Sequence, residues 1–395
     1  MKFISDIAIP RIKEAFSSMG EVQLFPAGEI TPAVLKSADG LLVRTTTKIT
    51  PALMDGSGVK FVGTATIGTD HIDLPYLKNR GIHLSSAPGC NATAVAEYIL
   101  TALLALGQKS GLSLKQRTLG IIGAGNTGRA VKKIAEAMGI RCLLNDPPLA
   151  ETSSGADYRP LDDLIRYADI ISIHVPLTRT GQYPTFHLIS EAVIRRLNPG
   201  TIIINTSRGE TLDGQGLKAN RERLGALILD VWENEPRIDT ELLQCVDIAT
   251  PHVAGYSLEG KMRATEMIYR DACDYFGLAA AWKIEDGLSE REPPVLTIHD
   301  EDQLPEQAVT QAYNIWEDDA RLRLFPEQDN PGEYFAALRN QYRLRREFSS
   351  YRFSVRAPLA ASRRRLLAQL GFSIRDGQEE GDVQSSNARL HSEVV

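Results

Sequence analysis

Short apolar runs alternate with helix-like segments over the first 90 residues, and the apolar positions of the helical segments recur every three or four residues. Alternation of this kind predicts a parallel sheet with helices packed on its faces, because such strands are buried on both sides. Strands are expected at residues 3–4, 22–25, 41–43, 60–62 and 82–85, with helices at 12–19 and 33–38. This part of the chain is therefore expected to fold as an α/β domain.

A second series of apolar runs follows a long segment, residues 92–107, in which nearly every position is apolar. A helix that is apolar all round is buried, so this segment is expected to form a core helix between domains. Buried strands are predicted at residues 119–122, 140–144, 170–174, 201–205, 227–231 and 248–249. Together the two series predict two Rossmann-like, doubly wound parallel-sheet domains of the α/β class.

The pattern changes near residue 285, where an acid- and proline-rich stretch, 285–296, is expected to be a linker. Beyond it, helical stretches at 305–323, 331–346 and 360–370 and a strand-like 351–355 predict a small α+β C-terminal domain. The expected domains are a discontinuous substrate-binding domain (1–92 and 253–284), a nucleotide-binding domain (93–252), a C-terminal dimerisation domain (285–375) and a polar, disordered tail (376–395).

Composition narrows the class of protein. The chain has 395 residues, 43% of them hydrophobic and 24% charged, which is typical of soluble globular domains. A net charge of −6 argues against nonspecific binding to nucleic acid or anionic membranes, and no apolar window is long enough to span a bilayer. The first residues lack the features of a signal peptide. The cysteines are widely spaced, without a metal-binding pattern, so we expect reduced thiols, no metal and a cytoplasmic protein: Cys90, Cys142, Cys245 and Cys273.

Three glycines follow the strand expected at 119–122. The first allows a tight strand-to-helix turn, the second lets the backbone approach a pyrophosphate, and the third lets helix and strand pack closely. Asp146 ends the next strand, 18 residues after Gly128, where its carboxylate can accept hydrogen bonds from ribose hydroxyls and repel a 2′-phosphate. A purely structural turn is the alternative, but the strand, helix and terminal acid together favour NAD over NADP. The residues expected to bind it are Gly123, Gly125, Asn126, Thr127, Gly128 and Asp146.

Further motifs place reactive side chains at the ends of expected strands, where open α/β sheets bind ligands. Arg208 follows the strand at 201–205, and its guanidinium can hold a carboxylate or carbonyl oxygen. His252 follows the strand at 248–249, and histidine is the usual base for the hydroxyl proton when an alcohol is oxidised. Asp230 and Glu235 lie at the end of the strand at 227–231, and Glu235 is a candidate to orient the histidine.

Each of these residues has a structural alternative. Arg208 could be a surface charge, His252 a structural histidine, and Asp230 and Glu235 solvated loop acids. Their occurrence together at strand ends of one nucleotide-binding domain favours a dehydrogenase.

The motifs GAGNTG, HVPLT, NTSRG, LDVWENEP and TPHVAG occur in the order that is typical of one enzyme family. On these motifs the chain resembles the D-isomer-specific 2-hydroxyacid dehydrogenases. The segments FVGTATIGTDHID, APGCNATAVAEY and PHVAGYSLEGK, with the extra C-terminal domain, are similar to one branch of that family over residues 1 to about 375. That resemblance implies NAD-dependent oxidation of 4-phospho-D-erythronate at C2, a step towards pyridoxal phosphate, in a cytoplasmic homodimer.

The resemblance also implies roles for individual residues. Arg208, Glu235 and His252 would be the catalytic set, with His252 as the acid/base. Contacts to NAD are implied for Asp146, Val175, Thr206, Ser207, Arg208, Asp230 and Gly255, and contacts to substrate for Thr45, Thr66 and Tyr256. Val175 stands where relatives often carry threonine, so only a backbone contact is expected there.

A phosphorylated substrate also needs cationic partners. Arg44 and Lys48 are candidates from the first domain, and Arg345 and Arg346 from the third, although the cluster at 343–346 could equally be a solvated helix face. Two other functions fit the same motifs. One is a sibling dehydrogenase of 3-phosphoglycerate, glyoxylate or hydroxypyruvate, and the other is an NAD-sensing regulator on the same fold.

Overall fold

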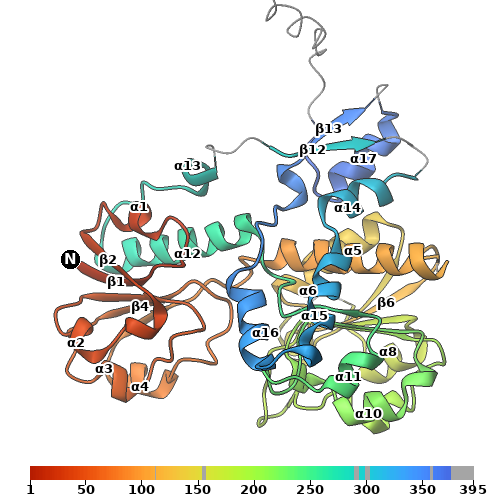
Figure 1. The fold of residues 1–395 in the computed structure, drawn as a ribbon, viewed down its shortest axis with the longest axis horizontal. Coiled ribbons are helices and arrows are strands. Elements are labelled where there is room, and N and C mark those ends of the chain that lie inside the picture. The colour runs from red at the N-terminus through yellow and green to blue at the C-terminus, as the bar shows by residue number, and fades with distance from the viewer. Residues whose placement is uncertain (112, 154–156, 289–292, 299–302, 356–358, 375–395) are drawn as a thin grey trace, which may run out of the picture.

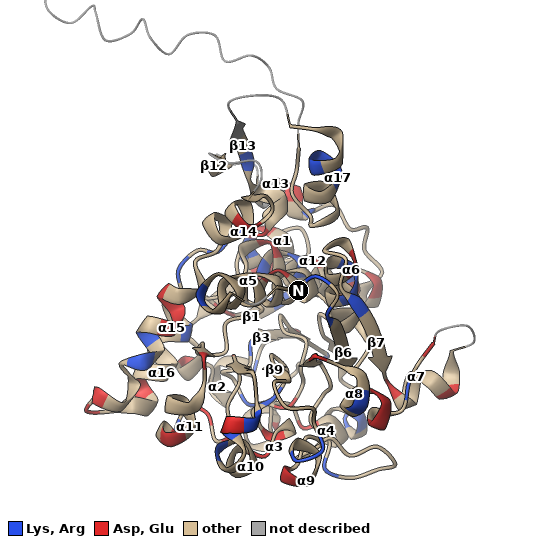
Figure 2. Cartoon of the chain, turned by 90° about the vertical axis from the view of Figure 1, so that its right-hand side faces the viewer, with Lys and Arg blue, Asp and Glu red and all other residues tan. Residues whose placement is uncertain are grey.

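The computed structural model describes residues 1–111, 113–153, 157–288, 293–298, 303–355 and 359–374 (Figure 1). The predicted tail at 376–395 and part of the predicted linker lie outside the described residues. None of the helices in the described ranges is long and apolar enough to cross a membrane. Figure 2 shows Lys and Arg interspersed with Asp and Glu over the described part of the chain.

The first domain is a five-stranded parallel sheet in the order β2-β1-β3-β4-β5. Its strands are β1 (Lys2–Asp6), β2 (Glu21–Phe25), β3 (Gly40–Val43), β4 (Phe61–Thr64) and β5 (His83–Ser85). Short helices connect them: α1 (Ile12–Phe16), α2 (Pro32–Leu35), α3 (Pro51–Met54) and α4 (Leu74–Asn79). The chain returns to this sheet in α12 (Leu258–Phe276), whose Ile268 and Tyr269 share one core with Phe3 and Phe61.

The second domain is a six-stranded parallel sheet in the order β11-β10-β9-β8-β6-β7, which confirms the predicted α/β class. The strands are β6 (Thr118–Ile122), β7 (Arg141–Asn145), β8 (Ile170–Ile173), β9 (Ile202–Asn205), β10 (Ala226–Leu229) and β11 (Ile248–Ala249). The helices are α5 (Ala92–Ser110), α6 (Asn126–Ala137), α7 (Pro147–Thr152), α8 (Leu161–Tyr167), α9 (Glu191–Ile194), α10 (Gly214–Ala219) and α11 (Thr240–Cys245). As the apolar pattern indicates, α5 is buried along most of its length.

The C-terminal segment continues through α13 (Ile284–Leu288), β12 (Val295–Ile298), α14 (Glu306–Ala312), α15 (Ile315–Arg323), α16 (Pro331–Asn340), β13 (Arg352–Val355) and α17 (Ala361–Gln369). The expectation that residues 285–296 are all linker is wrong at both ends. Residues 285–288 lie in α13, and Val295 and Leu296 belong to β12, which pairs in parallel with β13. The local sequence does not indicate β12, because two prolines precede it and its partner strand lies far along the chain. The predicted helix at 331–346 ends earlier, at Asn340.

The C-terminal segment shares its core with the second domain. Leu296, Phe348 and Leu367 belong to the same buried cluster as the apolar face of α5, and Phe335 packs with residues of the second sheet. Asp319 on α15 also accepts a hydrogen bond from the backbone N–H of Ala249 (2.8 Å), at the edge strand β11. Removing this segment would therefore expose apolar surface on the second domain. Figure 1 shows α15 and α16 lying against that domain, with α16 beside the junction of the two sheets.

We predict that Phe335→Ala lowers the free energy of unfolding by about 3–5 kcal/mol, because it leaves a cavity in the core that the segment shares with the second sheet. Leu324→Ala is the matched control, since Leu324 belongs to the same segment but is 45% exposed; its effect should stay within about 0.5 kcal/mol. Chemical denaturation measures both. A loss below about 1 kcal/mol for Phe335→Ala would show that the segment packs independently.

Candidate active site

A cavity of about 560 Å³ lies between the two sheet domains. Its walls come from the loops that follow β1, β3, β4, β5, β6, β8, β9, β10 and β11, so it lies at the carboxyl ends of both sheets. This is the place where open parallel sheets bind ligands, because helix N-termini and strand-end loops face it. The start of α12 and the end of α16 complete the wall.

The glycine turn after β6 has the geometry that a dinucleotide needs. Gly123 has a φ of +90°, and a Cβ there would lie 2.8 Å from the carbonyl carbon of His174. A Cβ on Gly128 would overlap the carbonyl oxygen of Gly123, which explains how closely α6 packs on the turn. A Cβ on Gly125 would meet nothing within 4 Å, and this glycine lines the cavity, so a ligand can approach its backbone. The site therefore fits a pyrophosphate at the start of α6.

Asp146 lies beside this turn, at the end of β7. Its Oδ2 accepts a hydrogen bond from the N–H of Ala124 (2.8 Å), and its Oδ1 accepts one from Leu149 (3.1 Å), which caps α7. Each oxygen keeps a free lone pair, so the carboxylate can still accept hydrogen bonds from a ribose.

Gly123, Gly128 and Asp146 are not among the residues that line the cavity. All the other residues expected to bind NAD line it, together with Gly125: Asn126, Thr127, Val175, Thr206, Ser207, Arg208, Asp230 and Gly255. The hydroxyl of Ser207 donates to Asn205 Oδ1 (2.8 Å), so its side chain is already engaged. Next to Val175, burial lowers the pKa of His174 to about 3, and this imidazole is therefore neutral.

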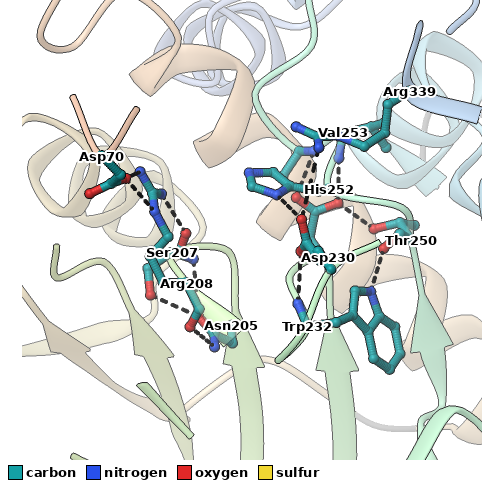
Figure 3. A network of polar contacts seen from close by, with 12 residues as sticks. Asp70, Asn205, Ser207, Arg208, Asp230, Trp232, Thr250, His252, Val253 and Arg339 are labelled. Atoms are coloured by element: carbon teal, nitrogen blue, oxygen red, sulfur yellow. Dashed lines mark hydrogen bonds and ion pairs between the residues drawn. The ribbon is translucent and has the colours of Figure 1, made fainter. Parts of the chain in front are cut away.

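His252, which is labelled in Figure 3, forms a close pair with Glu235, with 2.7 Å between Nδ1 and Oε2. His252 lines the cavity, whereas Glu235 is largely buried and does not line it. Burial opposes ionisation of Glu235, but the charge and hydrogen bond of His252, with a contribution from Arg339, lower the pKa of this carboxyl. Glu235 is therefore an anion at neutral pH. A proton held on Nδ1 and donated to Glu235 leaves Nε2 able to accept another.

The backbone that carries His252 is held by Asp230. This buried carboxylate accepts hydrogen bonds from the hydroxyl of Thr250 (2.6 Å) and the N–H groups of Val253 (2.7 Å) and Ala254 (2.9 Å). The N–H of His252 donates to the carbonyl oxygen of Asp230 (2.6 Å), and the residue adopts a φ of +59°. Burial raises the pKa of Asp230, opposed by the charge of His252 and these hydrogen bonds. Asp230 therefore positions the histidine loop.

Arg208 faces the first domain across the cavity. Its Nη2 donates to Asp70 Oδ2 (2.9 Å), and its Nη1 donates to the carbonyl oxygen of Ser207 (2.8 Å). Asp70 is 67% exposed, so this ion pair is worth little and can exchange for another carboxylate.

The residues expected to contact substrate lie on the first-domain side. Thr45, Thr66, Arg44 and Tyr256 all line the cavity. Arg44 is already paired with the buried Asp6, whose Oδ2 accepts from Nε at 2.9 Å. The hydroxyl of Thr66 donates to the carbonyl oxygen of Gly68 (3.1 Å).

Arg346 does not reach the cavity, which corrects the sequence-based assignment. Its Nε donates to Glu259 Oε1 at 2.5 Å, and this ion pair is almost completely buried. Arg345 is also buried and donates to the carbonyl oxygens of Ala94 and Ala254. Lys48 is exposed away from the cavity. The arginines point elsewhere because α16 ends at Asn340, and the chain beyond it leaves the helix.

Two cations that the sequence did not single out do line the cavity, Lys261 and Arg339. Lys261 lies in the first turn of α12, shortly after His252 in the sequence. Its closeness to His252 in the chain could have indicated that it lies at the site. Arg339 carried no such signal, because only the packing of α16 brings it to the site.

Comparison with known proteins places this geometry in a family. Residues 103–254 match the family described as "D-isomer specific 2-hydroxyacid dehydrogenase, NAD binding domain", and residues 296–371 match a domain of unknown function. The chain is 45% identical to an erythronate-4-phosphate dehydrogenase of Enterobacter sp. (strain 638), over 94% of this chain and 98% of that protein. It is 43% identical to the enzyme of the same name from Escherichia fergusonii, with the same coverage.

Solved structures agree in fold. The chain is similar to a 3-phosphoglycerate dehydrogenase of Entamoeba histolytica with NAD⁺ bound (28% identity, TM-score 0.61, 70% of this chain and 95% of that one). It is also similar to a D-lactate dehydrogenase of Aquifex aeolicus in complex with NAD and lactic acid (26% identity, TM-score 0.57, 70% and 96%).

Proposed function

This chain belongs to the erythronate-4-phosphate dehydrogenases of the D-isomer-specific 2-hydroxyacid dehydrogenase family, and on that premise we propose that it oxidises 4-phospho-D-erythronate at C2. The product would be 3-hydroxy-2-oxo-4-phosphooxybutanoate, on a route to pyridoxal phosphate. The observation that carries the proposal is the 2.7 Å contact between His252 and Glu235 on a cavity shared with Arg208 and the glycine turn.

His252 acts as the base. Its Nε2 takes the proton of the C2 hydroxyl while the C2–H bond breaks, and the imidazolium that forms is stabilised by the carboxylate of Glu235. NAD, when bound, accepts the hydride that leaves C2. In the reverse direction the same Nε2 returns its proton to the carbonyl oxygen. The catalytic set is therefore Arg208, Glu235 and His252.

Arg208 orients the substrate. Its guanidinium exchanges Asp70 for the substrate carboxylate or the C2 oxygen, which fixes the hydroxyl opposite His252. Thr45, Thr66 and Tyr256 would contact the rest of the substrate.

The glycine turn, Asp146 and the strand-end loops hold the cofactor. The start of α6 would bind the pyrophosphate, and Asp146 the adenosine ribose. Asp230 Oδ2 accepts only one hydrogen bond from the described residues, from Ala254, so it can take one more from the nicotinamide carboxamide.

A steady-state assay with NAD and a panel of substrates tests the proposal: 4-phosphoerythronate, 3-phosphoglycerate, and glyoxylate and hydroxypyruvate in the reductive direction with NADH. We expect the highest kcat/KM with 4-phosphoerythronate. Preference for another acid would favour a sibling dehydrogenase. Retained NADH binding without turnover of any of them would favour a regulator.

His252→Asn should lower kcat by roughly 10²–10⁴-fold, the usual contribution of a positioned acid/base, while NADH binding is kept. His187→Asn is the matched control, because His187 also pairs with a carboxylate (Glu233, 2.7 Å) but does not line the cavity. Turnover and NADH fluorescence titration measure the two effects. Near-normal turnover of His252→Asn would remove this residue from the mechanism.

Asp146→Asn should lower the preference for NAD over NADP by at least about tenfold, because the negative charge that repels a 2′-phosphate is lost. The amide oxygen can still accept from the backbone, so the turn is disturbed less than by alanine. The ratio of kcat/KM values for NAD and NADP measures the change. An unchanged ratio would mean that Asp146 does not read the ribose.

We further propose that the protein works as a cytoplasmic homodimer that pairs through its C-terminal segment. Within the described residues β12 and β13 form a sheet of two strands, and Val295 on β12 is 60% exposed. An exposed apolar edge of this kind supports pairing with a second copy. Sedimentation velocity on the intact chain decides, and a monomer at working concentration would contradict the proposal.

A further inference from the structure

The guanidinium of Arg339 faces the cavity without a full set of partners. Its Nη1 lies 3.9 Å from Glu235 Oε2, and its Nη2 lies 3.4 Å from the Tyr256 hydroxyl, which is long for a hydrogen bond. Its Nε is buried and has no hydrogen-bond partner among the described residues. The side chain is 25% exposed, on the cavity, and a charge that is largely withdrawn from water is costly unless it is paired, so this arrangement points to an anion that comes from outside the chain.

Lys261 is a second cation close to the same tyrosine. Its Nζ is 4.6 Å from the centre of the Tyr256 ring, and Arg339 Cζ is 6.0 Å from that centre. Within the described residues no carboxylate pairs with this ammonium. Burial, with the positive charges of Arg44 and Arg345, lowers the pKa of Lys261 to about 8. An anionic ligand would relieve this repulsion.

The position of the two cations matches one end of the substrate. Arg339 lies next to Glu235, the partner of His252, and in the view of Figure 3 His252 stands between Arg208 and Arg339. A substrate whose C2 hydroxyl faces His252 and whose carboxylate faces Arg208 therefore extends its C4 end towards Arg339 and Lys261. A dianion needs more than one cation, and these two have no carboxylate within hydrogen-bonding distance in the described structure, whereas Arg44 is committed to Asp6.

We propose that Arg339 and Lys261 bind the terminal phosphate of the substrate, so that the C-terminal segment completes the active site of its own chain. This inference rests on the proposed function. It gives a role at the catalytic cavity to the segment that matches a domain of unknown function. Arg339 thereby takes the role that the sequence-based prediction gave to Arg346.

Kinetics with two substrates isolate the phosphate contact. Arg339→Gln and Lys261→Gln should each raise KM for 4-phosphoerythronate by roughly 10–100-fold, the worth of a charge-assisted hydrogen bond, with a smaller change in kcat. For D-erythronate, which lacks the phosphate, kcat/KM should change less than about threefold. Arg339→Lys keeps the charge and should restore part of the lost affinity.

The comparison of the two substrates also separates phosphate binding by Arg339 from its effect on the pKa of Glu235. Loss of that charge raises the pKa of Glu235 and would slow both substrates alike. Arg343→Gln is the matched control for net charge, because Arg343 belongs to the same segment but pairs with Glu317 away from the cavity. Equal effects of Arg339→Gln on both substrates, or an unaltered KM for 4-phosphoerythronate, would overturn the inference.

Calorimetry separates this inference from the proposed function. Inorganic phosphate is titrated into the NADH-loaded wild-type protein and into Arg339→Gln. Binding that weakens at least about tenfold in the variant supports the site even if 4-phosphoerythronate is not oxidised. Equal binding to both proteins, or no binding to the wild type, overturns the site even if the enzyme oxidises 4-phosphoerythronate.

Discussion

The buried carboxylate of Asp230 holds the catalytic geometry together. The two carboxylate oxygens accept hydrogen bonds from the Thr250 hydroxyl and from the backbone N–H groups of Val253 and Ala254. The backbone carbonyl oxygen of Asp230 accepts a hydrogen bond from the N–H of His252. These bonds keep the histidine in a left-handed conformation, with its ring against Glu235. Because Asp230 directly follows β10, which is paired on both sides, the parallel sheet fixes the position of the loop, and the loop fixes the position of the base. The chemistry of the site depends on this short chain of contacts.

The C-terminal segment also contacts the histidine loop. Arg345 donates to the carbonyl oxygen of Ala254, and Glu259 at the start of α12 binds Arg346 and the N–H of Glu347. Helix α12 packs against the first sheet. Helix α5 and the second sheet share a core with the C-terminal segment. The segment thus packs where the two sheet domains meet, and a change there can reach the active site.

The sequence was informative wherever the signal was local. The glycines at 123, 125 and 128, the acid at 146 and the strand-end positions of Arg208 and His252 follow from residues that are near one another in the chain. The cations proposed to bind the phosphate, Arg339 and Lys261, were not identified in this way. Arg346 was a candidate because a phosphate needs cations and the chain clusters arginines at 343–346, but α16 ends at Asn340 and Arg346 pairs with Glu259. The strand β12 was missed for a similar reason, because its partner lies more than fifty residues away.

The central claim is that this chain removes a hydride from C2 of 4-phosphoerythronate and passes it to NAD. Oxidation of substrate that carries deuterium at C2, followed by mass spectrometry of the reduced cofactor, tests this directly. The account predicts NADH that is heavier by one deuterium, formed in step with the 2-oxo product. Unlabelled NADH, or product without reduced cofactor, would contradict it.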